Sequence, residues 1–253
     1  MNFGIEGKKY LVTGASSGIG QASAILISKF GGRVILNGRN EERLNRTLSQ
    51  MEGKGHHIMP FNLKNLNRIG KFVKDCVQID DVRFDGAVFA SGTSINRPIR
   101  AETLEGVDEM LKVNYLSYFA LIKEFCSRKV LNDGGAIAAV SSQASIVPDK
   151  GQSSYGSRKA ALDTLSMVAS RELEKRRVRV NLILPGATKT PASEAFFASN
   201  TEDKLKEMYP LGVIQPEDIA NAAIFFLSDM SNKITGQRLV VLGGHFMGPY
   251  NVL

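Results

Sequence analysis

Tyr155 and Lys159 stand four residues apart in the segment Tyr-Gly-Ser-Arg-Lys, so a helix at this point would carry both side chains on one face. A lysine ammonium beside a phenol stabilises the phenolate and lowers the phenol pKa from its usual value of about 10. Such a tyrosine can act as a general acid or base in carbonyl and alcohol chemistry. The alternative is an ordinary pair on a helix surface, so the neighbouring residues must decide.

Two further polar residues could work with this pair. Ser142 follows a predicted strand at residues 136–141, and in parallel sheets the ligand crevice lies at the carboxyl ends of the strands. Its hydroxyl could hold a substrate oxygen beside Tyr155, although serines in such segments are also common turn and cap residues. Asn114 is polar at a helical position with apolar neighbours, which fits either a role in the site or a buried amide with satisfied hydrogen bonds.

A glycine-rich turn follows the first predicted strand, residues 9–13, and leads into a helix. Gly14 allows a tight turn, Gly18 lets the backbone approach a pyrophosphate, and Gly20 allows close packing of helix on strand. The free N–H groups at the helix start would face the anion. The alternative is a plain connection with glycine at turn positions. The order of strand, turn and helix favours dinucleotide binding.

Arg39 stands just after the second predicted strand, residues 33–37, where a carboxylate would bind the ribose 2′-hydroxyl of NAD(H) and an arginine would accommodate the 2′-phosphate of NADP(H). No carboxylate occupies the tip of this strand, and a guanidinium makes paired bonds to phosphate. The interpretation is therefore that NADP(H) is favoured over NAD(H). The alternative is a solvated helix-entry residue with Glu41 and Glu42 as its partners.

The elements that must position these residues alternate along the whole chain, as in βαβ units with a parallel sheet. The predicted strands are residues 9–13, 33–37, 56–61, 86–90, 136–141, 178–184 and 238–242. The predicted helices are residues 19–30, 41–51, 66–77, 104–127, 154–175 and 216–227. The sequence therefore predicts an α/β fold, a Rossmann-like doubly wound sheet of seven mainly parallel strands with helices on both faces.

The domain organisation follows from what interrupts this pattern. No linker, repeat or charge block divides the chain, so residues 1–253 are expected to form a single dinucleotide-binding and catalytic domain. Residues 187–209 break the rhythm of strands and helices just after a strand. This segment is the expected lid over the ligand crevice.

Composition limits the classes of function. The net charge of +7 favours anionic ligands, which include phosphates, acidic carrier proteins and nucleic acid. Nucleic acid is not expected, because the basic residues are scattered and the chain has no Trp. No membrane partner is expected, because no apolar run approaches the roughly 20 residues of a span. Cys76 and Cys126 are too few for a disulfide framework and too far apart for metal ligands, so we expect a cytoplasmic protein without a metal site.

Together, these motifs resemble those of the short-chain dehydrogenase/reductase family over nearly the whole chain. Residues 13–20 match the family's glycine-rich cofactor motif, and Tyr155 with Lys159 matches its Tyr-x-x-x-Lys signature. Ser142 and Asn114 fall on the other two members of its catalytic tetrad. The C-terminal pattern resembles that of the 3-oxoacyl-carrier-protein reductase branch, at residues 216–220, 234–237 and 243–244.

The resemblance also implies where the cofactor binds. The implied contacts are Gly14, Ser16, Ser17, Gly18, Ile19, Gly20, Arg39, Asn62, Leu63, Ala90, Gly92, Tyr155, Lys159, Pro185, Gly186, Thr188 and Thr190. The chain departs from the family's pattern at three of these regions. Phe89 and Ala90 replace two amides beside the cofactor, Asn62 replaces an aspartate near adenine, and Ser17 replaces a basic residue common in NADP-dependent members.

The mechanism implied by the resemblance is reduction of a ketone to a secondary alcohol, or the reverse. Tyr155 would exchange the proton, Lys159 would lower its pKa and bind the nicotinamide ribose, and Ser142 would orient the substrate oxygen. Asn114 would hold a water that connects Lys159 to solvent. The family also suggests a homotetramer, with the tail at residues 245–253 able to pack on a neighbouring subunit or on its own core.

Several substrates and functions remain open at this point. The substrate could be a small molecule or carrier-bound, with 3-oxoacyl thioesters, sugars, steroids and other secondary alcohols among the candidates. An acidic carrier would suit the basic cluster formed by Arg171, Lys175, Arg176, Arg177 and Arg179, which could equally be a solvated helix end. A second hypothesis is a dinucleotide-binding sensor without catalysis, and a third is nucleic-acid binding.

Overall fold

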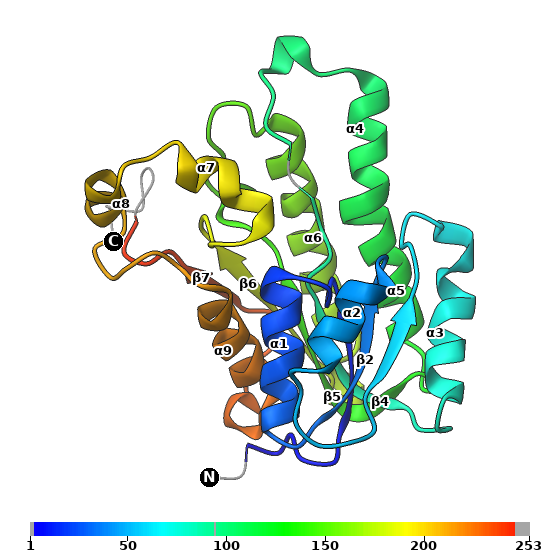
Figure 1. Cartoon of the computed structure of the whole chain (residues 1–253). Coiled ribbons are helices and arrows are strands. Elements are labelled where there is room, and N and C mark those ends of the chain that lie inside the picture. The colour runs from blue at the N-terminus through cyan, green and yellow to red at the C-terminus, as the bar shows by residue number, and fades with distance from the viewer. Residues whose placement is uncertain (1–2, 94, 246–253) are drawn as a thin grey trace.

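One sheet of seven parallel strands forms the centre of the computed structural model, which describes residues 3–93 and 95–245 (Figure 1). The strand order is β3-β2-β1-β4-β5-β6-β7, so the chain winds outward from β1 in both directions. The strands are β1 Lys9–Thr13, β2 Arg33–Gly38, β3 His57–Pro60, β4 Phe84–Phe89, β5 Leu131–Val140, β6 Arg179–Pro185 and β7 Arg238–Val241. The prediction of a seven-stranded, doubly wound sheet is confirmed.

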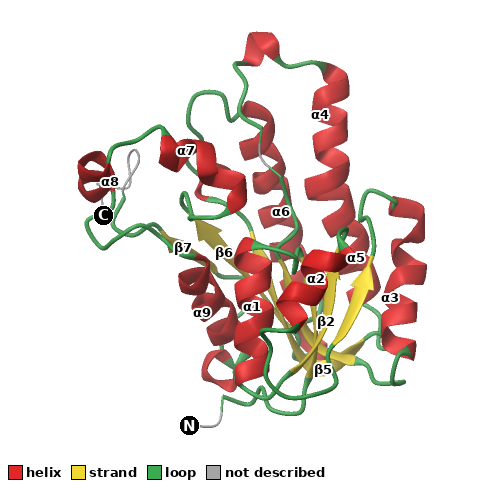
Figure 2. Ribbon diagram, viewed as in Figure 1, coloured by secondary structure: helices red, strands yellow, loops and turns green. Residues whose placement is uncertain are grey.

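Helices cover both faces of this sheet (Figure 2). They are α1 Gly18–Lys29, α2 Glu41–Leu48, α3 Ile69–Gln78, α4 Leu104–Leu111, α5 Ser117–Phe125, α6 Ser153–Glu172, α7 Glu194–Ala198, α8 Glu202–Met208 and α9 Pro216–Leu227. Two apolar clusters fill the two layers. One joins the sheet to α3, α5 and α6, and the other joins it to α1, α2 and α9. Every residue of β1 and β6 is buried, as expected for strands covered on both faces.

Two predicted elements differ from the structure in an informative way. The fifth strand begins at Leu131 and not at residue 136, because its first residues pair with β4 before a bulge at Gly134, whose φ is +80°. The helix expected over residues 104–127 is interrupted by a π-helical turn, Lys112–Leu116, between α4 and α5. Such turns are rare and often mark functional positions.

The expected lid contains helices that the sequence pattern did not predict. A short 3-10 helix, Pro191–Ser193, precedes α7, and α8 follows. The tail begins at His245, whose Nδ1 lies 3.0 Å from the Met208 carbonyl oxygen. The rest of the tail, with Phe246, Met247 and Tyr250, lies outside the described residues. Within the described residues, no helix is long and apolar enough to cross a bilayer.

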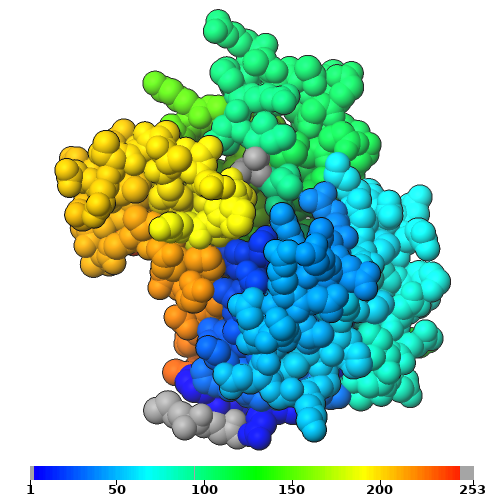
Figure 3. All heavy atoms as spheres, in the orientation of Figure 1, coloured from blue at the N-terminus to red at the C-terminus, as the bar shows by residue number. Residues whose placement is uncertain are grey.

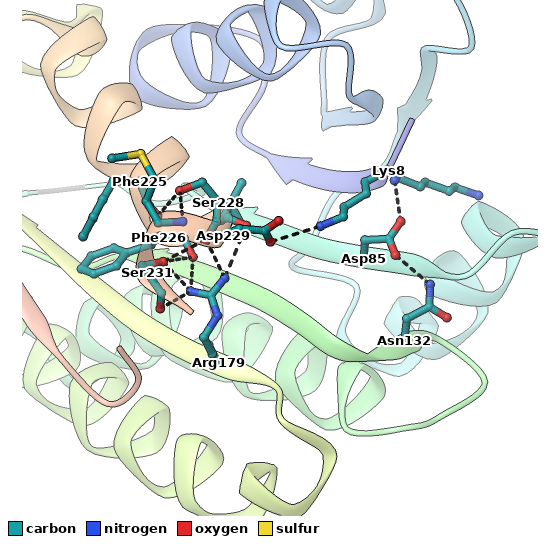
Figure 4. Close-up of polar contacts among 12 residues, drawn as sticks. Lys8, Asp85, Asn132, Arg179, Phe225, Phe226, Ser228, Asp229 and Ser231 are labelled. Atoms are coloured by element: carbon teal, nitrogen blue, oxygen red, sulfur yellow. Dashed lines mark hydrogen bonds and ion pairs between the residues drawn. The ribbon is translucent and has the colours of Figure 1, made fainter. Parts of the chain in front are cut away.

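Two arginines of the basic cluster are structural. Arg179 begins β6 and donates to carbonyl oxygens at the end of α9 and just beyond it, which are those of Phe226, Leu227, Ser228 and Ser231 (Figure 4). Arg176 donates to Asp133 and to the carbonyl oxygens of Cys126 and Leu131. Both lie at the amino end of β6, at the edge of the sheet opposite to Ser142. These two arginines therefore support the fold, whereas Arg171, Lys175 and Arg177 are exposed.

Candidate active site

The predicted site residues gather at the carboxyl edge of the sheet, because parallel strands all end there. Ser142 follows β5, the glycine-rich turn follows β1, and Gly92 follows β4. In the space-filling view the surface is hollowed at this edge, between the yellow segment around α7 and the teal segment that follows β4 (Figure 3). The blue turn after β1 borders the same hollow.

The glycine turn has the local geometry that the sequence predicts. Gly14 has a φ of +69°, and a Cβ there would lie 3.0 Å from the Ala90 carbonyl oxygen. A Cβ on Gly20 would lie 2.4 Å from the Gly14 carbonyl oxygen, so only glycine allows α1 to pack this closely on the turn. Ser17 begins α1 without a side-chain cap, which leaves the first N–H groups of the helix available to an anion.

Thr13 organises the neighbouring loop, a role that the sequence analysis did not assign. Its Oγ1 accepts hydrogen bonds from the backbone N–H groups of Ala90 and Ser91, both at 3.2 Å. These bonds tie the end of β1 to the end of β4 at the position where the family's two amides are missing. The available signal in the sequence was a threonine at the last residue of a predicted strand.

Gly92 lies between Asn114 and Lys159. A Cβ on Gly92 would be 2.9 Å from Asn114 Oδ1 and 3.8 Å from Lys159 Nζ. Asn114 belongs to the π-helical turn, where its Oδ1 accepts from the Thr93 N–H at 3.0 Å and its Nδ2 donates to the Met110 carbonyl at 3.2 Å. Both polar atoms of this buried amide therefore have hydrogen-bond partners. This agrees with the interpretation of Asn114 as a buried amide with satisfied hydrogen bonds.

Lys159 is held by the strand that ends beside Ser142. Its Nζ donates to the Val140 carbonyl oxygen at 2.8 Å, and only 5% of the residue is exposed. Burial lowers the pKa of Lys159 to about 8, although the Asp163 carboxylate acts in the opposite direction. The ammonium is thus fixed at the end of β5.

The electrostatics of Tyr155 differ from the expectation that Lys159 lowers its pKa. Burial of the phenol is the largest effect and raises the pKa of Tyr155 above its usual value. The groups that lower it are the Ser142 hydroxyl, through a side-chain hydrogen bond, and the Arg158 guanidinium. Burial therefore outweighs both of these lowering effects, and the lowering of the Tyr155 pKa by Lys159 stays a prediction.

Asp163 is a further buried group that the sequence analysis missed. It lies one helical turn beyond Lys159 on α6 and is 2% exposed. Its Oδ2 accepts from the Ser145 hydroxyl at 2.7 Å and lies 3.7 Å from Arg238 Nε. Burial raises the pKa of Asp163 above its usual value. The i, i+4 spacing after Lys159 was the available signal.

The remaining predicted cofactor positions line the same edge. Arg39 is exposed at the tip of β2 and, among the described residues, makes no ion pair, whereas Glu42 pairs with Arg46. The Asn62 side-chain oxygen accepts from the Lys64 N–H at 3.1 Å, and Leu63 is buried in the core. Glu42 thus pairs with Arg46 and not with Arg39, and the exposure of Arg39 fits both a phosphate-binding and a solvated arginine.

The segment that follows β6 packs against the glycine turn. The Gly186 N–H donates to the Val241 carbonyl oxygen at 2.9 Å, and the Thr188 hydroxyl donates to the Gly186 carbonyl at 3.2 Å. Thr190 lies against the glycine turn, since a Cβ on Gly18 would be 3.0 Å from its Cγ2. Pro185 ends β6, and Ser16 and Ile19 lie in and just after the glycine turn.

Known proteins resemble this chain along nearly its whole length. A family model described as enoyl-(acyl carrier protein) reductase matches residues 14–245. A 3-oxoacyl-[acyl-carrier-protein] reductase of Rickettsia felis is 32% identical over 96% of this chain and 98% of its own. A solved short-chain dehydrogenase/reductase from Serratia marcescens aligns with a TM-score of 0.86 and 26% identity, over 94% of this chain and 98% of its own. This chain belongs to the short-chain dehydrogenase/reductase family.

Other members of the short-chain dehydrogenase/reductase family show how varied the similar proteins are. A 2,5-dichloro-2,5-cyclohexadiene-1,4-diol dehydrogenase of Sphingobium indicum is also 32% identical, over 96% of this chain and 98% of its own. A short-chain type dehydrogenase/reductase from Mycobacterium ulcerans aligns with a TM-score of 0.84 and 30% identity, over 94% of this chain and 90% of its own. The chain is thus an oxidoreductase that acts on carbonyl or CH–OH groups.

Proposed function

We propose that this protein is an NADPH-dependent reductase that converts a ketone into a secondary alcohol, with Tyr155 as the general acid. The observation that carries the proposal is the convergence of four side chains at one edge of the sheet. Tyr155 lies beside Ser142, and Lys159 and Asn114 meet across Gly92. A phenol, a hydroxyl and a buried ammonium in this arrangement suit proton transfer to a carbonyl oxygen.

The residues around the glycine turn fit a dinucleotide phosphate. The uncapped start of α1 offers N–H groups, and a groove of about 250 Å³ lies beside it, lined in part by Ser17, Gly18 and Lys189. Arg39, exposed and without an ion pair among the described residues, would hold the 2′-phosphate. The bound cofactor would supply the hydride. The other contacts we propose are the cofactor positions named from the sequence.

The proton chemistry would be carried out by the residues of this chain. Ser142 would orient the substrate oxygen toward Tyr155, whose hydroxyl would give up its proton as the alcohol forms. Lys159, held by the Val140 carbonyl, would bind the ribose hydroxyls and support the phenolate. Asn114 would fix the loop after β4 through Thr93 and hold a water that leads from Lys159 to solvent. Residues 187–209 would close over the substrate as a lid.

The substrate class is proposed from the relatives. Six of the similar proteins are 3-oxoacyl-carrier-protein reductases, so a 3-oxoacyl thioester on an acyl carrier is our first candidate. The diol dehydrogenase, equally similar in sequence, supports the alternative of another secondary alcohol. Both substrates would use the same four side chains.

We also propose a homotetramer in the cytoplasm, with the whole chain as one catalytic domain. Apolar side chains are exposed on the outer faces of α5, α6 and β7, at Phe119, Met167, Val168, Leu239 and Val240. Such faces suit contacts between subunits. Cys76 and Cys126 are both free, which suits a reducing compartment.

The test is consumption of NADPH or NADH with a panel of ketones that includes acetoacetyl thioesters. Tyr155→Phe removes the hydroxyl that would carry the transferable proton and leaves the ring, so turnover should fall by about 100-fold or more while NADPH still binds. Turnover that survives in Tyr155→Phe would overturn the assignment of the general acid. Tight NADPH binding with no turnover on any substrate would favour the dinucleotide sensor.

A further inference from the structure

Arg158 is the largest side chain in the described part of the protein that is less than 2% exposed. It lies on α6 between Tyr155 and Lys159, and its guanidinium carbon is 5.7 Å from the centre of the Tyr155 ring. Among the described residues, its Nε, Nη1 and Nη2 atoms are buried without a hydrogen-bond partner. A buried cation without partners is costly, so its presence requires an explanation.

The other two buried arginines show how this protein normally holds a guanidinium. Arg179 donates to carbonyl oxygens and to Ser231 (Figure 4). Arg176 donates to two carbonyl oxygens and Asp133. Both join separate parts of the backbone, which is a structural role. Arg158 joins nothing of this kind, although it is less exposed than either of them. A purely structural role therefore does not account for it.

The charged and titratable groups near Arg158 are few. Tyr155 and Lys159 neighbour it on α6, and Glu102 is the charged residue that acts on it from another segment. Glu102 is occupied by the Ser154 hydroxyl at 2.6 Å, and among the described residues it makes no ion pair with Arg158. On Tyr155 the other polar influence comes from Ser142. Asp163 acts on Lys159 and is itself approached by Arg238.

We propose that Arg158 is a positioning residue of the active site, a second buried cation that stabilises negative charge on the Tyr155 oxygen together with Lys159. A buried cation over the ring of a half-buried phenol favours the ionised form, because water screens a buried charge only weakly. This accounts for a guanidinium left without hydrogen bonds beside the reacting phenol. Arg158 acts through Tyr155 and does not touch the substrate.

The positive charge of Arg158 would also act on the pKa of Lys159. Arg158 and Lys159 are consecutive cations on α6 that repel each other, and Arg158 lowers the pKa of Lys159. Removal of the Arg158 charge should therefore raise the pKa values of both Tyr155 and Lys159. A residue that only filled space would move neither. The inference rests on the proposed role of Tyr155, so its test must also work without turnover.

The experiment compares Arg158→Met, which removes the charge, with Arg158→Lys, which keeps it. Arg171→Met is the matched control, because Arg171 is an exposed arginine on the same helix. Circular dichroism first establishes the pH range in which each variant is folded. The first readout is the pH dependence of alcohol oxidation with NADP⁺. The second is tyrosinate absorbance at alkaline pH, with Tyr155→Phe subtracted, which is clear because the chain has no Trp.

In Arg158→Met the ascending limb of the oxidation profile should move up by about one pH unit, and the Tyr155 tyrosinate at a given pH should fall about tenfold. Arg158→Lys and Arg171→Met should match the unmodified protein in both readouts. An unchanged tyrosinate titration in Arg158→Met would overturn the inference, as would an equal shift in Arg158→Lys. If no alcohol is oxidised, the proposed function fails and the tyrosinate readout still decides the role of Arg158.

Discussion

One face of α6 carries four ionisable side chains, of which Arg158, Lys159 and Asp163 are buried and Tyr155 is half-buried. Burial opposes the charged form of each, and it raises the pKa values of Tyr155 and Asp163 while it lowers those of Arg158 and Lys159. For Lys159 the Asp163 carboxylate and the Val140 carbonyl favour the charged form, whereas the Arg158 guanidinium opposes it. The pKa values of these side chains therefore depend on the balance between burial and the neighbouring charges, and not on any single contact.

Lys159→Met should stabilise the protein without cofactor at neutral pH. The pKa of Lys159 is about 8 in the folded protein, below the ordinary lysine value of 10.5, so between these values the unfolded chain binds more protons. Stability therefore rises with pH in this window for the unmodified protein and not for the variant. At neutral pH the variant should gain about 3 kcal/mol, less the cost of the lost bond to Val140.

Urea denaturation of both proteins across this pH range measures the effect. The stability advantage of Lys159→Met should be constant below about pH 8 and should decline as the pH rises toward 10.5. An advantage that does not change with pH would show that Lys159 titrates normally in the folded state.

Arg39→Ala should separate the two cofactors. Arg39 is exposed and lacks an ion pair among the described residues, so its removal costs little stability. The loss of a charge-assisted bond to a 2′-phosphate should weaken NADPH binding by about 10- to 100-fold and leave NADH almost unchanged. Titration calorimetry with each nucleotide measures both constants. Equal weakening of the two would contradict the NADP(H) assignment.

The residue types of the site were predictable, and their electrostatics were not. The spacing of Tyr155 and Lys159 and the position of Ser142 after a strand indicate which side chains meet. The sequence does not reveal Arg158 as buried, because arginine is usually exposed and its helical position looks like surface. It also does not reveal how strongly burial acts on Tyr155, since that depends on every segment packed around the phenol.

At the scale of elements, the glycine turn shows how close packing of a helix on the backbone restricts which residue can stand at one position. Gly20→Ala should lower the free energy of unfolding by about 1–3 kcal/mol, because its Cβ would lie 2.4 Å from the Gly14 carbonyl oxygen. Gly70 on α3 is the matched control, since a Cβ there meets only the end of the Glu124 side chain. Gly70→Ala should be neutral or slightly stabilising.

Chemical denaturation measures both alanine variants, and NADPH titration follows the turn itself. Gly20→Ala should also weaken NADPH binding, because α1 must shift away from the turn that precedes it. Equal free energies of unfolding for the two variants would show that α1 can shift away from the turn at no cost in stability.

Helices and strands were predictable where a local sequence pattern determines their bounds. They were missed where contacts with distant parts of the chain determine them. The first strand and the last helix have the predicted bounds, since each is an apolar run with clear ends. The π-helical turn around Asn114 was missed because residues 104–127 keep a helical period throughout. The helices of the lid were missed because each is short, and short helices depend on packing more than on propensity.

At the scale of the whole molecule, apolar side chains of the described residues are exposed on two separate surfaces of interest. One lies on α5 and α6, with Phe119 and Val168 each 45% exposed. The other lies on β7, an edge strand whose Leu239 is 38% exposed. Exposed edges and apolar helix faces are usually covered by another subunit. Two different surfaces, each pairing with its own copy across a twofold axis, produce a tetramer.

This arrangement predicts the effect of a charge on each surface. The unmodified chain of 27.6 kDa should have about four times that mass by light scattering. Val168→Glu and Leu239→Glu should each yield dimers, because each disrupts one surface and leaves the other. Leu211→Glu, at an exposed apolar residue after α8, is the matched control and should remain tetrameric. A monomeric mass for the unmodified chain would refute the tetramer, and a mass unchanged by both substitutions would refute the two surfaces.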